Sequence, residues 1–231
     1  MEETRNEHGE IAGYIGNLIR ENFGKGPTPV YVTIEHPFLV IQLRDFLAPM
    51  EAILVSQKEN KRVEETRDLL FDQLQTEIRS QLEKMAGITI QEMYFDWDLD
   101  KKRGVILGIM SEDTSGCQAK WPGHLNHKRF NDKVIELSEW GQKVPETTES
   151  FWLNERTIVI KRTGVFVEIE KELIAAGYTN ELKEVKKPLE LRMIHKASLE
   201  SFIDGKIAEV FVSWHFTGDK AYAVLIVQPK N

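Results

Sequence analysis

The stretch FLVIQLRDFLAPMEAIL (residues 38–54) returns later in the chain as TIVIKRTGVFVEIEKEL (residues 157–173). Each copy begins with a run of β-branched and aliphatic residues, passes a short link and ends in an amphipathic helical pattern. The offset between the copies is 119 positions (157 minus 38), which aligns Glu51 with Glu170. This strand–turn–helix unit is therefore expected twice in the fold.

A second pair of similar segments lies farther along each half of the chain. IQEMYFDWDLDKKRGVILGI (90–109) resembles IAEVFVSWHFTGDKAYAVLIV (207–227) and aligns Trp97 with Trp214. A period near half the chain is far longer than the repeats of solenoid proteins. The pattern therefore predicts two fused tandem copies of one domain.

Each copy is predicted to read α-β-β-α-α-β-β. In the first copy a helix over 11–22 precedes a hairpin of VYVTIE (30–35) and FLVIQL (38–43), and a long helix ends at Gly87. Because the strands pair as hairpins, the fold class is α+β with mainly antiparallel sheets and packed helices. The halves are interpreted as a pseudo-dimer, since the interface of a single-copy dimer would remain available to them.

The expected domains are residues 8–110 and 127–228, joined by a linker at 111–126 that is rich in turn-forming residues. In the second copy, a proline at 188 predicts a kink or a fresh start in the long helix.

Composition restricts the classes of function. The chain has 231 residues and a net charge of −7, which disfavours a nucleic-acid partner. Its single cysteine, Cys117, fits a reducing compartment. The charged N-terminus does not resemble a signal peptide, and the sequence has no apolar run long enough to be a membrane span. The sequence thus favours a cytoplasmic protein, at most peripheral at the membrane and without membrane insertion.

No motif in the sequence specifies catalysis, a cofactor or a metal. Asp96, Asp98 and Asp100 alternate as in a calcium loop, but the glycine and glutamate that such a loop requires are missing. His124 and His127 are three apart, as in some zinc sites, yet exposed loop histidines are the favoured interpretation because zinc needs three or four ligands. An enzyme is therefore not favoured, although it is left open.

Some residue types recur at matching positions. Glu51 and Glu170 have basic counterparts in Arg67 and Lys186 on the following helix, which predicts an ion pair at the corner between two helices. Trp97 and Trp214 recur in strands of alternating polarity and are expected to be core or interface anchors.

The segment FGKGP (23–27) has the glycines and lysine of a phosphate loop. A phosphate loop follows a strand and opens a helix, whereas this segment follows a helix and leads into a strand. Gly24 is therefore interpreted as a helix C-cap. The second copy keeps Lys143 but neither glycine. If the segment binds an anion or a partner, the expected contacts are Lys25, Arg67 and Lys143.

Over residues 8–110 the sequence resembles the MpsC-like family of small bacterial proteins. The resemblance is carried by FGKGP, by the turn at 43–47 with Glu51, by Val63 with Arg67, and by the closing hairpin. Family members often have threonine as a helix N-cap where this chain has Ala48.

The resemblance implies a soluble accessory or regulatory partner of a membrane system that generates membrane potential and is associated with sodium and bicarbonate uptake. The family has no established catalytic residues, and its members are usually single-domain. An alternative is a protein or enzyme that binds a small anion or a nucleotide at the seam between the halves, since clefts between domains are common ligand sites.

Overall fold

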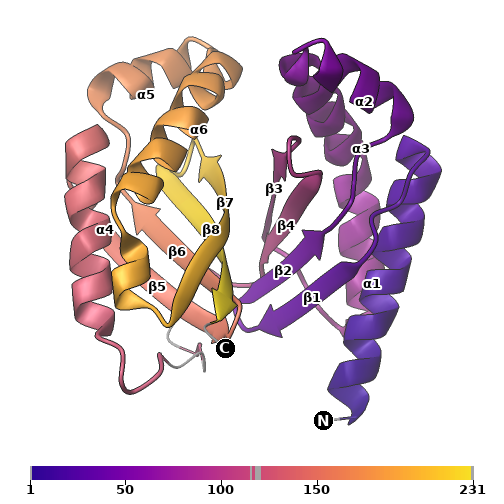
Figure 1. The fold of residues 1–231 in the computed structure, drawn as a ribbon, viewed down its shortest axis with the longest axis horizontal. Coiled ribbons are helices and arrows are strands. Elements are labelled where there is room, and N and C mark those ends of the chain that lie inside the picture. Colours follow the sequence, from indigo (N-terminus) through magenta and orange to yellow (C-terminus); the bar gives the residue numbers. More distant parts are fainter. Residues whose placement is uncertain (1, 115, 118–120, 230–231) are drawn as a thin grey trace. The chain divides into compact units, whose positions relative to one another are not determined.

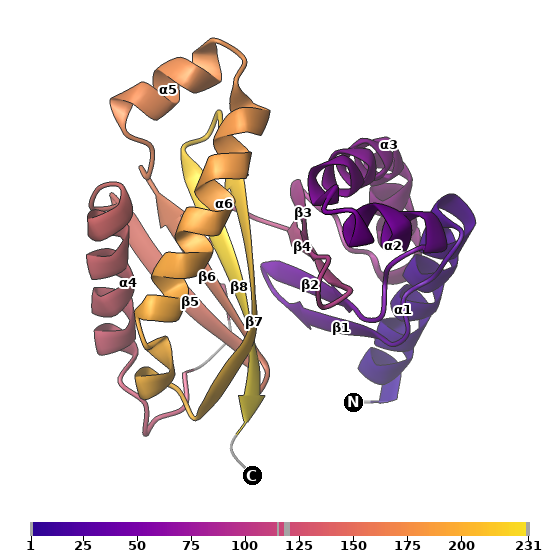
Figure 2. The ribbon, with the colours of Figure 1, turned by 45° about the horizontal axis from the view of Figure 1, so that its top comes forward.

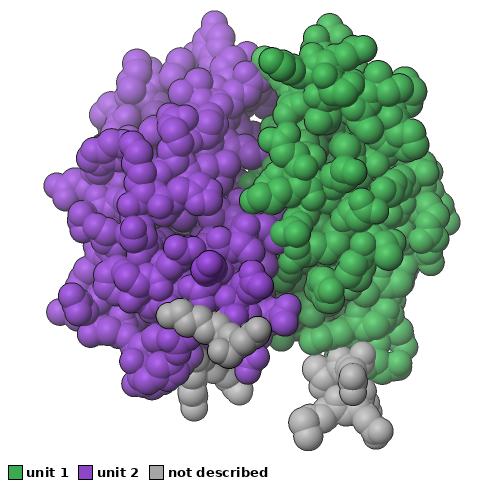
Figure 3. Space-filling view, in the orientation of Figure 1, with its two compact units in different colours: residues 1–118 green, residues 119–231 purple. Residues whose placement is uncertain are grey.

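The computed structural model describes residues 2–114, 116–117 and 121–229. The chain forms two compact units, unit 1 (residues 1–118) and unit 2 (residues 119–231), coloured separately in Figure 3. The boundary between them falls within the stretch expected to be a linker.

Unit 1 contains three helices and four strands among its described residues. In chain order they are α1 (Glu2–Phe23), β1 (Val30–Glu35), β2 (Phe38–Leu43), α2 (Pro49–Ser56), α3 (Asn60–Ala86), β3 (Glu92–Asp98) and β4 (Arg103–Ile109). This is the α-β-β-α-α-β-β order predicted from the sequence.

Unit 2 follows the same order and adds a short 3-10 helix. Its elements are α4 (His127–Gly141), β5 (Thr147–Asn154), β6 (Thr157–Thr163), α5 (Glu168–Ala175), α6 (Thr179–Lys196), η1 (Leu199–Phe202), β7 (Gly205–His215) and β8 (Lys220–Pro229). The α+β fold class with two similar halves is confirmed.

Each unit has one four-stranded antiparallel sheet. The strand orders are β1-β2-β4-β3 and β5-β6-β8-β7, so that the second strand of the first hairpin pairs with the last strand of the unit. Within each unit the helices pack on one face of the sheet (Figures 1 and 2). Residues 39, 41 and 43 of β2 and residues 158 and 160 of β6 belong to these helix-side cores.

The ends of the helices follow from local chemistry. Gly24 and Gly87 adopt φ values of 75° and 62°, and their amides close the last turns of α1 and α3 on Arg20 O and Glu83 O at 2.9 Å each. Because glycine adopts this left-handed conformation without steric cost, each one ends a helix. The interpretation of FGKGP as a helix stop before a strand is thus confirmed.

The fresh start expected at Pro188 is not found, and a kink at that position stays a prediction. α6 runs through Pro188 as one helix.

No helix within the described ranges is long and apolar enough to cross a membrane.

Candidate functional site

A buried ion pair joins the two helices at the corner of unit 1. Glu51 lies on α2 and accepts two hydrogen bonds from Arg67 on α3, at 2.8 Å from Nε and 2.6 Å from Nη2. The Arg67 side chain is 0% exposed, and its Nη2 also donates to Phe46 O at 2.9 Å. The second Glu51 oxygen accepts from Ala48 N at 2.7 Å, so one carboxylate caps α2 and anchors α3.

Unit 2 has the same corner with a lysine in place of the arginine. Lys186 on α6 donates to Glu170 on α5 at 2.8 Å, and the other Glu170 oxygen accepts from Val167 N at 3.0 Å. The Lys186 side chain is buried as well. The pairing expected between the recurring acids and bases is therefore present in both units.

The two recurring tryptophans lie beside these cations. The Arg67 guanidinium carbon is 4.1 Å from the Phe46 ring centre and 5.0 Å from that of Trp97. Lys186 Nζ is 5.9 Å from the Trp214 ring centre. Such contacts are attractive because a cation interacts with the negative face of an aromatic ring. Both tryptophans are buried.

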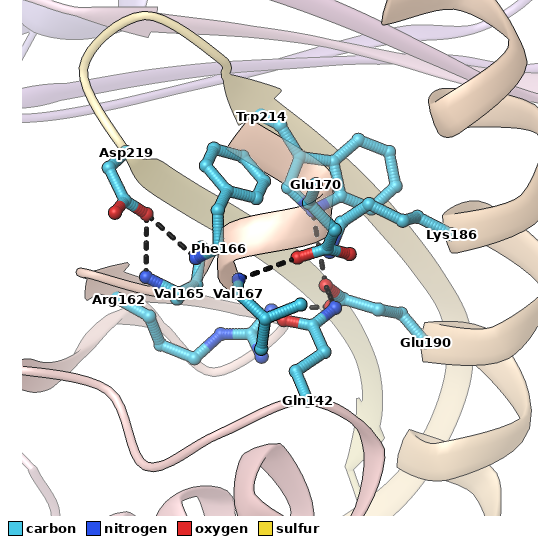
Figure 4. Close-up of polar contacts among 10 residues, drawn as sticks. All are labelled: Gln142, Arg162, Val165, Phe166, Val167, Glu170, Lys186, Glu190, Trp214 and Asp219. Atoms are coloured by element: carbon cyan, nitrogen blue, oxygen red, sulfur yellow. Dashed lines mark hydrogen bonds and ion pairs between the residues drawn. The ribbon is translucent and has the colours of Figure 1, made fainter. Parts of the chain in front are cut away.

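Unit 2 contains a second buried cluster, which we call the charged layer: Ser138 on α4, Arg162 on β6 and Glu190 on α6 (Figure 4 shows Arg162 and Glu190). Arg162 Nη2 pairs with Glu190 Oε2, and its Nη1 donates to Ser138 Oγ at 3.0 Å. Trp214 Nε1 donates to the other Glu190 oxygen at 3.1 Å. The layer thus ties both helices of the core to the sheet.

The charges of this layer are held inside the unit by one another. Burial by itself raises the pKa of Glu190, but the nearby cations Arg162 and Lys186 outweigh it and hold that pKa below its ordinary value. Glu190 therefore stays ionised in the folded protein. Together with Lys186 and Glu170, the charged layer forms a cluster of two buried cations and two buried carboxylates.

The corresponding positions of unit 1 are apolar. At the offset of 119, Ser138, Arg162 and Glu190 align with Ile19, Leu43 and Phe71, which we call the apolar layer. All three are 0–1% exposed, and the Phe71 ring lies 4.8 Å from that of Trp97. The same place in the fold is thus filled by hydrocarbon in one unit and by ions in the other.

A small cavity adjoins the charged layer. It is lined by Ser138, Arg162, Glu190 and apolar side chains of unit 2, and about 20 Å³ of it is open to the centre of a water molecule. Among the described residues, Arg162 Nε is buried without a hydrogen-bond partner. The space suffices for about one water molecule and is too small for a substrate.

A larger groove lies on the surface of unit 2 between α4 and α6. Its volume is about 420 Å³, and it is lined by Lys133, Glu136, Leu137, Glu139, Trp140, Met193, Lys196 and Ala197. Trp140 is 66% exposed, and Lys196 Nζ lies 5.4 Å from its ring centre. Lys133 is paired with Glu136 at 2.8 Å.

The residues expected to contact an anion are in different environments. Lys25 is partly exposed and pairs with Asp45 at 3.1 Å. Arg67 is fully buried with its charge paired, so its guanidinium is not open to the surface. Lys143 is half-buried and makes no hydrogen bond or ion pair with another described residue. Among the described residues of unit 1, no hydrogen bond or ion pair joins Lys25 to Arg67.

The histidines near the expected linker belong to unit 2. His127 stacks on Trp121 at 4.6 Å and lies 3.0 Å from Ser150 Oγ, while His124 pairs with Asp204. Burial lowers the pKa of His127 and outweighs the opposing contact with Ser150. In the described part of the chain, no group of three or more His, Cys, Asp or Glu residues is arranged to hold a metal ion.

Sequence reasoning missed the charged layer. A signal was available, because alternation along β6 places Arg162 on the same face as the core residues Ile158 and Ile160. Similarly, Glu190 lies four residues after Lys186 on the buried stripe of α6. When the two halves are aligned at the offset of 119, Arg162 and Glu190 fall at positions that hold apolar residues in the first half.

Comparison with known proteins places one unit in a family. Residues 4–112 match the family model described as "Na+-translocating membrane potential-generating system (MpsC)". Searches of curated proteins and of solved structures found no significant match. The family match spans nearly all of unit 1 and does not extend into unit 2. Residues 4–112 are therefore similar to the MpsC family, and unit 2 lies outside the match.

Proposed function

We propose that the protein is a non-enzymatic accessory or regulatory protein that acts with a membrane system for sodium or bicarbonate transport. The observation that carries this proposal is the match of residues 4–112 to a family whose description names a Na+-translocating membrane potential-generating system. In this proposal the chain works in the cytoplasm, peripherally at the membrane, and contacts a transporter complex through its surface.

The buried chemistry supports a structural role for the most prominent charged groups. Arg67, Lys186 and Glu190 are buried, and each pairs with a side chain of opposite charge. These pairs connect helices or join a helix to the sheet. Groups that neutralise one another inside a core stabilise one arrangement of the elements.

A gene deletion in the native host tests the proposal. We expect the deletion to lower the sodium-dependent membrane potential, followed with a voltage-sensitive dye, and sodium-dependent bicarbonate uptake. Re-expression of the wild-type chain should restore both. Unchanged potential and uptake in the deletion strain would contradict the proposal.

Matched variants connect that phenotype to unit 1. Arg67→Met removes the corner ion pair and should restore the phenotype poorly. Arg62→Met serves as the control, because Arg62 is 69% exposed on the same helix and pairs with Glu59 near the surface. The tagged wild-type chain should also co-purify with membrane transport subunits in mild detergent at low salt.

A second candidate function is the binding of a small anion or a nucleotide. The observation that favours it is the groove between α4 and α6, whose volume of about 420 Å³ lies within the usual range of ligand pockets. The exposed ring of Trp140 offers a face on which a base can stack, and the Lys196 ammonium offers a charge for an anionic group. A site between the halves, as expected from the sequence, stays a prediction.

A thermal-shift screen with nucleotides and small anions tests this second function. A ligand at about 100 times its dissociation constant stabilises the folded state by roughly 2.7 kcal/mol. Trp140→Ala should abolish the shift, whereas Tyr178→Ala, which changes an exposed aromatic residue outside the groove, should leave it unchanged. A flat response of the wild-type chain across the panel would count against ligand binding.

A further inference from the structure

We propose that the charged layer of unit 2 prevents the two units from exchanging helices and strands while the chain folds. The inference is independent of the transport role. It rests on a comparison of two buried layers, each of which lies wholly within its own unit: Ser138, Arg162 and Glu190 in unit 2, and Ile19, Leu43 and Phe71 in unit 1.

Exchange is a risk because the units have the same order of helices and strands and the same order of strands in the sheet. Tandem domains of similar structure are prone to assemble with each other's elements, and a covalent tether keeps those elements at high local concentration. The long helices α3 and α6 are the clearest case, since both pack on the last hairpin of their unit.

The corner ion pair gives no protection against such an exchange. Unit 1 pairs Glu51 with Arg67, and unit 2 pairs Glu170 with Lys186. If α3 took the place of α6, Arg67 would present a cation to Glu170, and the corner would still be neutral. A feature that both units share cannot distinguish the correct helix from the incorrect one.

The charged layer does distinguish them. With α3 in the place of α6, Phe71 would face Arg162, whose guanidinium would lose the carboxylate of Glu190 and stay buried. In the reciprocal exchange, Glu190 would be buried against Leu43. The first arrangement leaves Arg162 buried without its counter-ion, and the second separates Glu190 from Arg162, so both are disfavoured.

The charged layer also disfavours the exchange of α4 and of β6. Its three members come from α4, β6 and α6, so each of these elements contributes one partner. Replacing α4 by α1, for example, would put Ile19 in the place of the hydroxyl that accepts from Arg162 at 3.0 Å. The most stable assembly is thus the one in which all three elements belong to unit 2.

The test compares full-length chains in which the two layers are alike or different. One variant makes both layers apolar with Ser138→Ile, Arg162→Leu and Glu190→Phe, and adds Lys187→Asp. The added carboxylate aligns with Asp68, which accepts from the Trp97 indole at 3.4 Å, so it can accept from Trp214 when Glu190 is gone. A second variant carries these changes and also Ile19→Ser, Leu43→Arg and Phe71→Glu, so that the two layers trade places.

Each chain is unfolded in denaturant, refolded, and analysed by size-exclusion chromatography with light scattering and by an amide NMR spectrum. We expect the wild type to refold to one native monomer. The variant with two apolar layers should give a severalfold lower yield of native monomer, with oligomers or non-native monomers in its place. Exchange of the layers should recover the yield, because the two units differ again.

The free energy of unfolding of each chain, measured at equilibrium, separates incorrect assembly of the two units from a loss of stability of the folded state. A buried ion pair replaced by well-packed apolar residues is often as stable as before or more so. A lower native yield at undiminished stability therefore supports the proposal. A wild-type yield from the variant with two apolar layers would overturn it, and so would a fall in yield fully matched by a fall in stability. The comparison of the wild type with the variant that has two apolar layers tests the proposal even if the variant with exchanged layers does not fold.

Discussion

Unit 1 and unit 2 place different chemistry at the same position of the same fold. In unit 1, Phe71 packs on Trp97 and fills the space between the helices and the sheet. In unit 2, Glu190 occupies that place, pairs with Arg162 and accepts from the Trp214 indole. The order of elements and the strand pairing are the same around both layers.

The comparison shows that this fold tolerates either layer as long as each is complete in itself. An apolar layer is stable by burial of hydrocarbon, whereas a charged layer is stable only when every charge has its partner. A change to one member of the charged layer should therefore be more disruptive than its size suggests.

The largest effect is expected for Glu190→Gln. Loss of this carboxylate leaves the buried Arg162 without its counter-ion, while Lys186 keeps Glu170, so the free energy of unfolding of unit 2 should fall by about 3–5 kcal/mol. Chemical denaturation followed by tryptophan fluorescence measures it. Glu181→Gln on the exposed face of α6 is the matched control and should change stability by less than about 0.5 kcal/mol. Equal effects of the two changes would refute the role assigned to the charged layer.

A smaller effect is expected for Arg67→Lys in unit 1. Arg67 makes two hydrogen bonds to Glu51 and one to Phe46 O, whereas the lysine at this corner of unit 2 donates to a single oxygen of Glu170. Loss of the bidentate geometry should cost about 1–2 kcal/mol in the free energy of unfolding, measured by denaturant titration. Arg62→Lys is the exposed control. If Arg67→Lys and Arg62→Lys are equally stable, the two-pronged hydrogen bonding of Arg67 to Glu51 does not contribute to the stability of unit 1.

The pH dependence of stability should also distinguish the units. The folded-state pKa of Glu190 lies below its ordinary value of 4.5, so its contribution is complete above pH 4.5 and is lost as the pH falls through the folded-state pKa. Unfolding of unit 2, followed at decreasing pH, should therefore show this acid sensitivity. The variant with an apolar layer in unit 2 should show less of it, and an unchanged profile would speak against the assignment.

The smallest effect is expected for Lys25→Ala. Its pair with Asp45 has side chains that are 34% and 58% exposed, and such surface pairs contribute less than about 1 kcal/mol. Thermal unfolding should therefore be nearly unchanged. If Lys25 contacts the membrane partner, co-purification with that partner should weaken although stability is retained. Wild-type co-purification would remove Lys25 from the interface.

Much of the architecture could be predicted from short-range patterns. The first hairpin was placed at 30–35 and 38–43, and the structure has β1 and β2 at those residues. The C-terminal ends of α1 and α3 were marked by Gly24 and Gly87 because glycine alone adopts a positive φ without cost. The corner between Glu51 and Arg67 could be predicted because an acid and a base stand at matching positions in both halves of the sequence.

The charged layer is only partly accessible to such patterns, because alternation along β6 places Arg162 on the core face but does not identify its counter-ion. In the sequence, Arg162 follows Lys161 at the end of an apolar strand, and a long charged side chain at such a place is usually exposed at its tip. Whether it is buried depends on an acid that comes from α6, 28 residues away. Pattern reasoning along one element contains no information about that partner.

The sequence by itself determined the repeated order of elements, the antiparallel hairpins, the ends of the helices and the resemblance of residues 8–110 to the MpsC-like family. These properties depend on periodicity and on single residues with special backbone preferences. Only the tertiary structure decided which charged residues lie inside, because burial of an ion depends on whether distant elements bring its counter-ion to the same place. Ser138, Arg162 and Glu190 meet that condition in unit 2, and Ile19, Leu43 and Phe71 do not require it in unit 1.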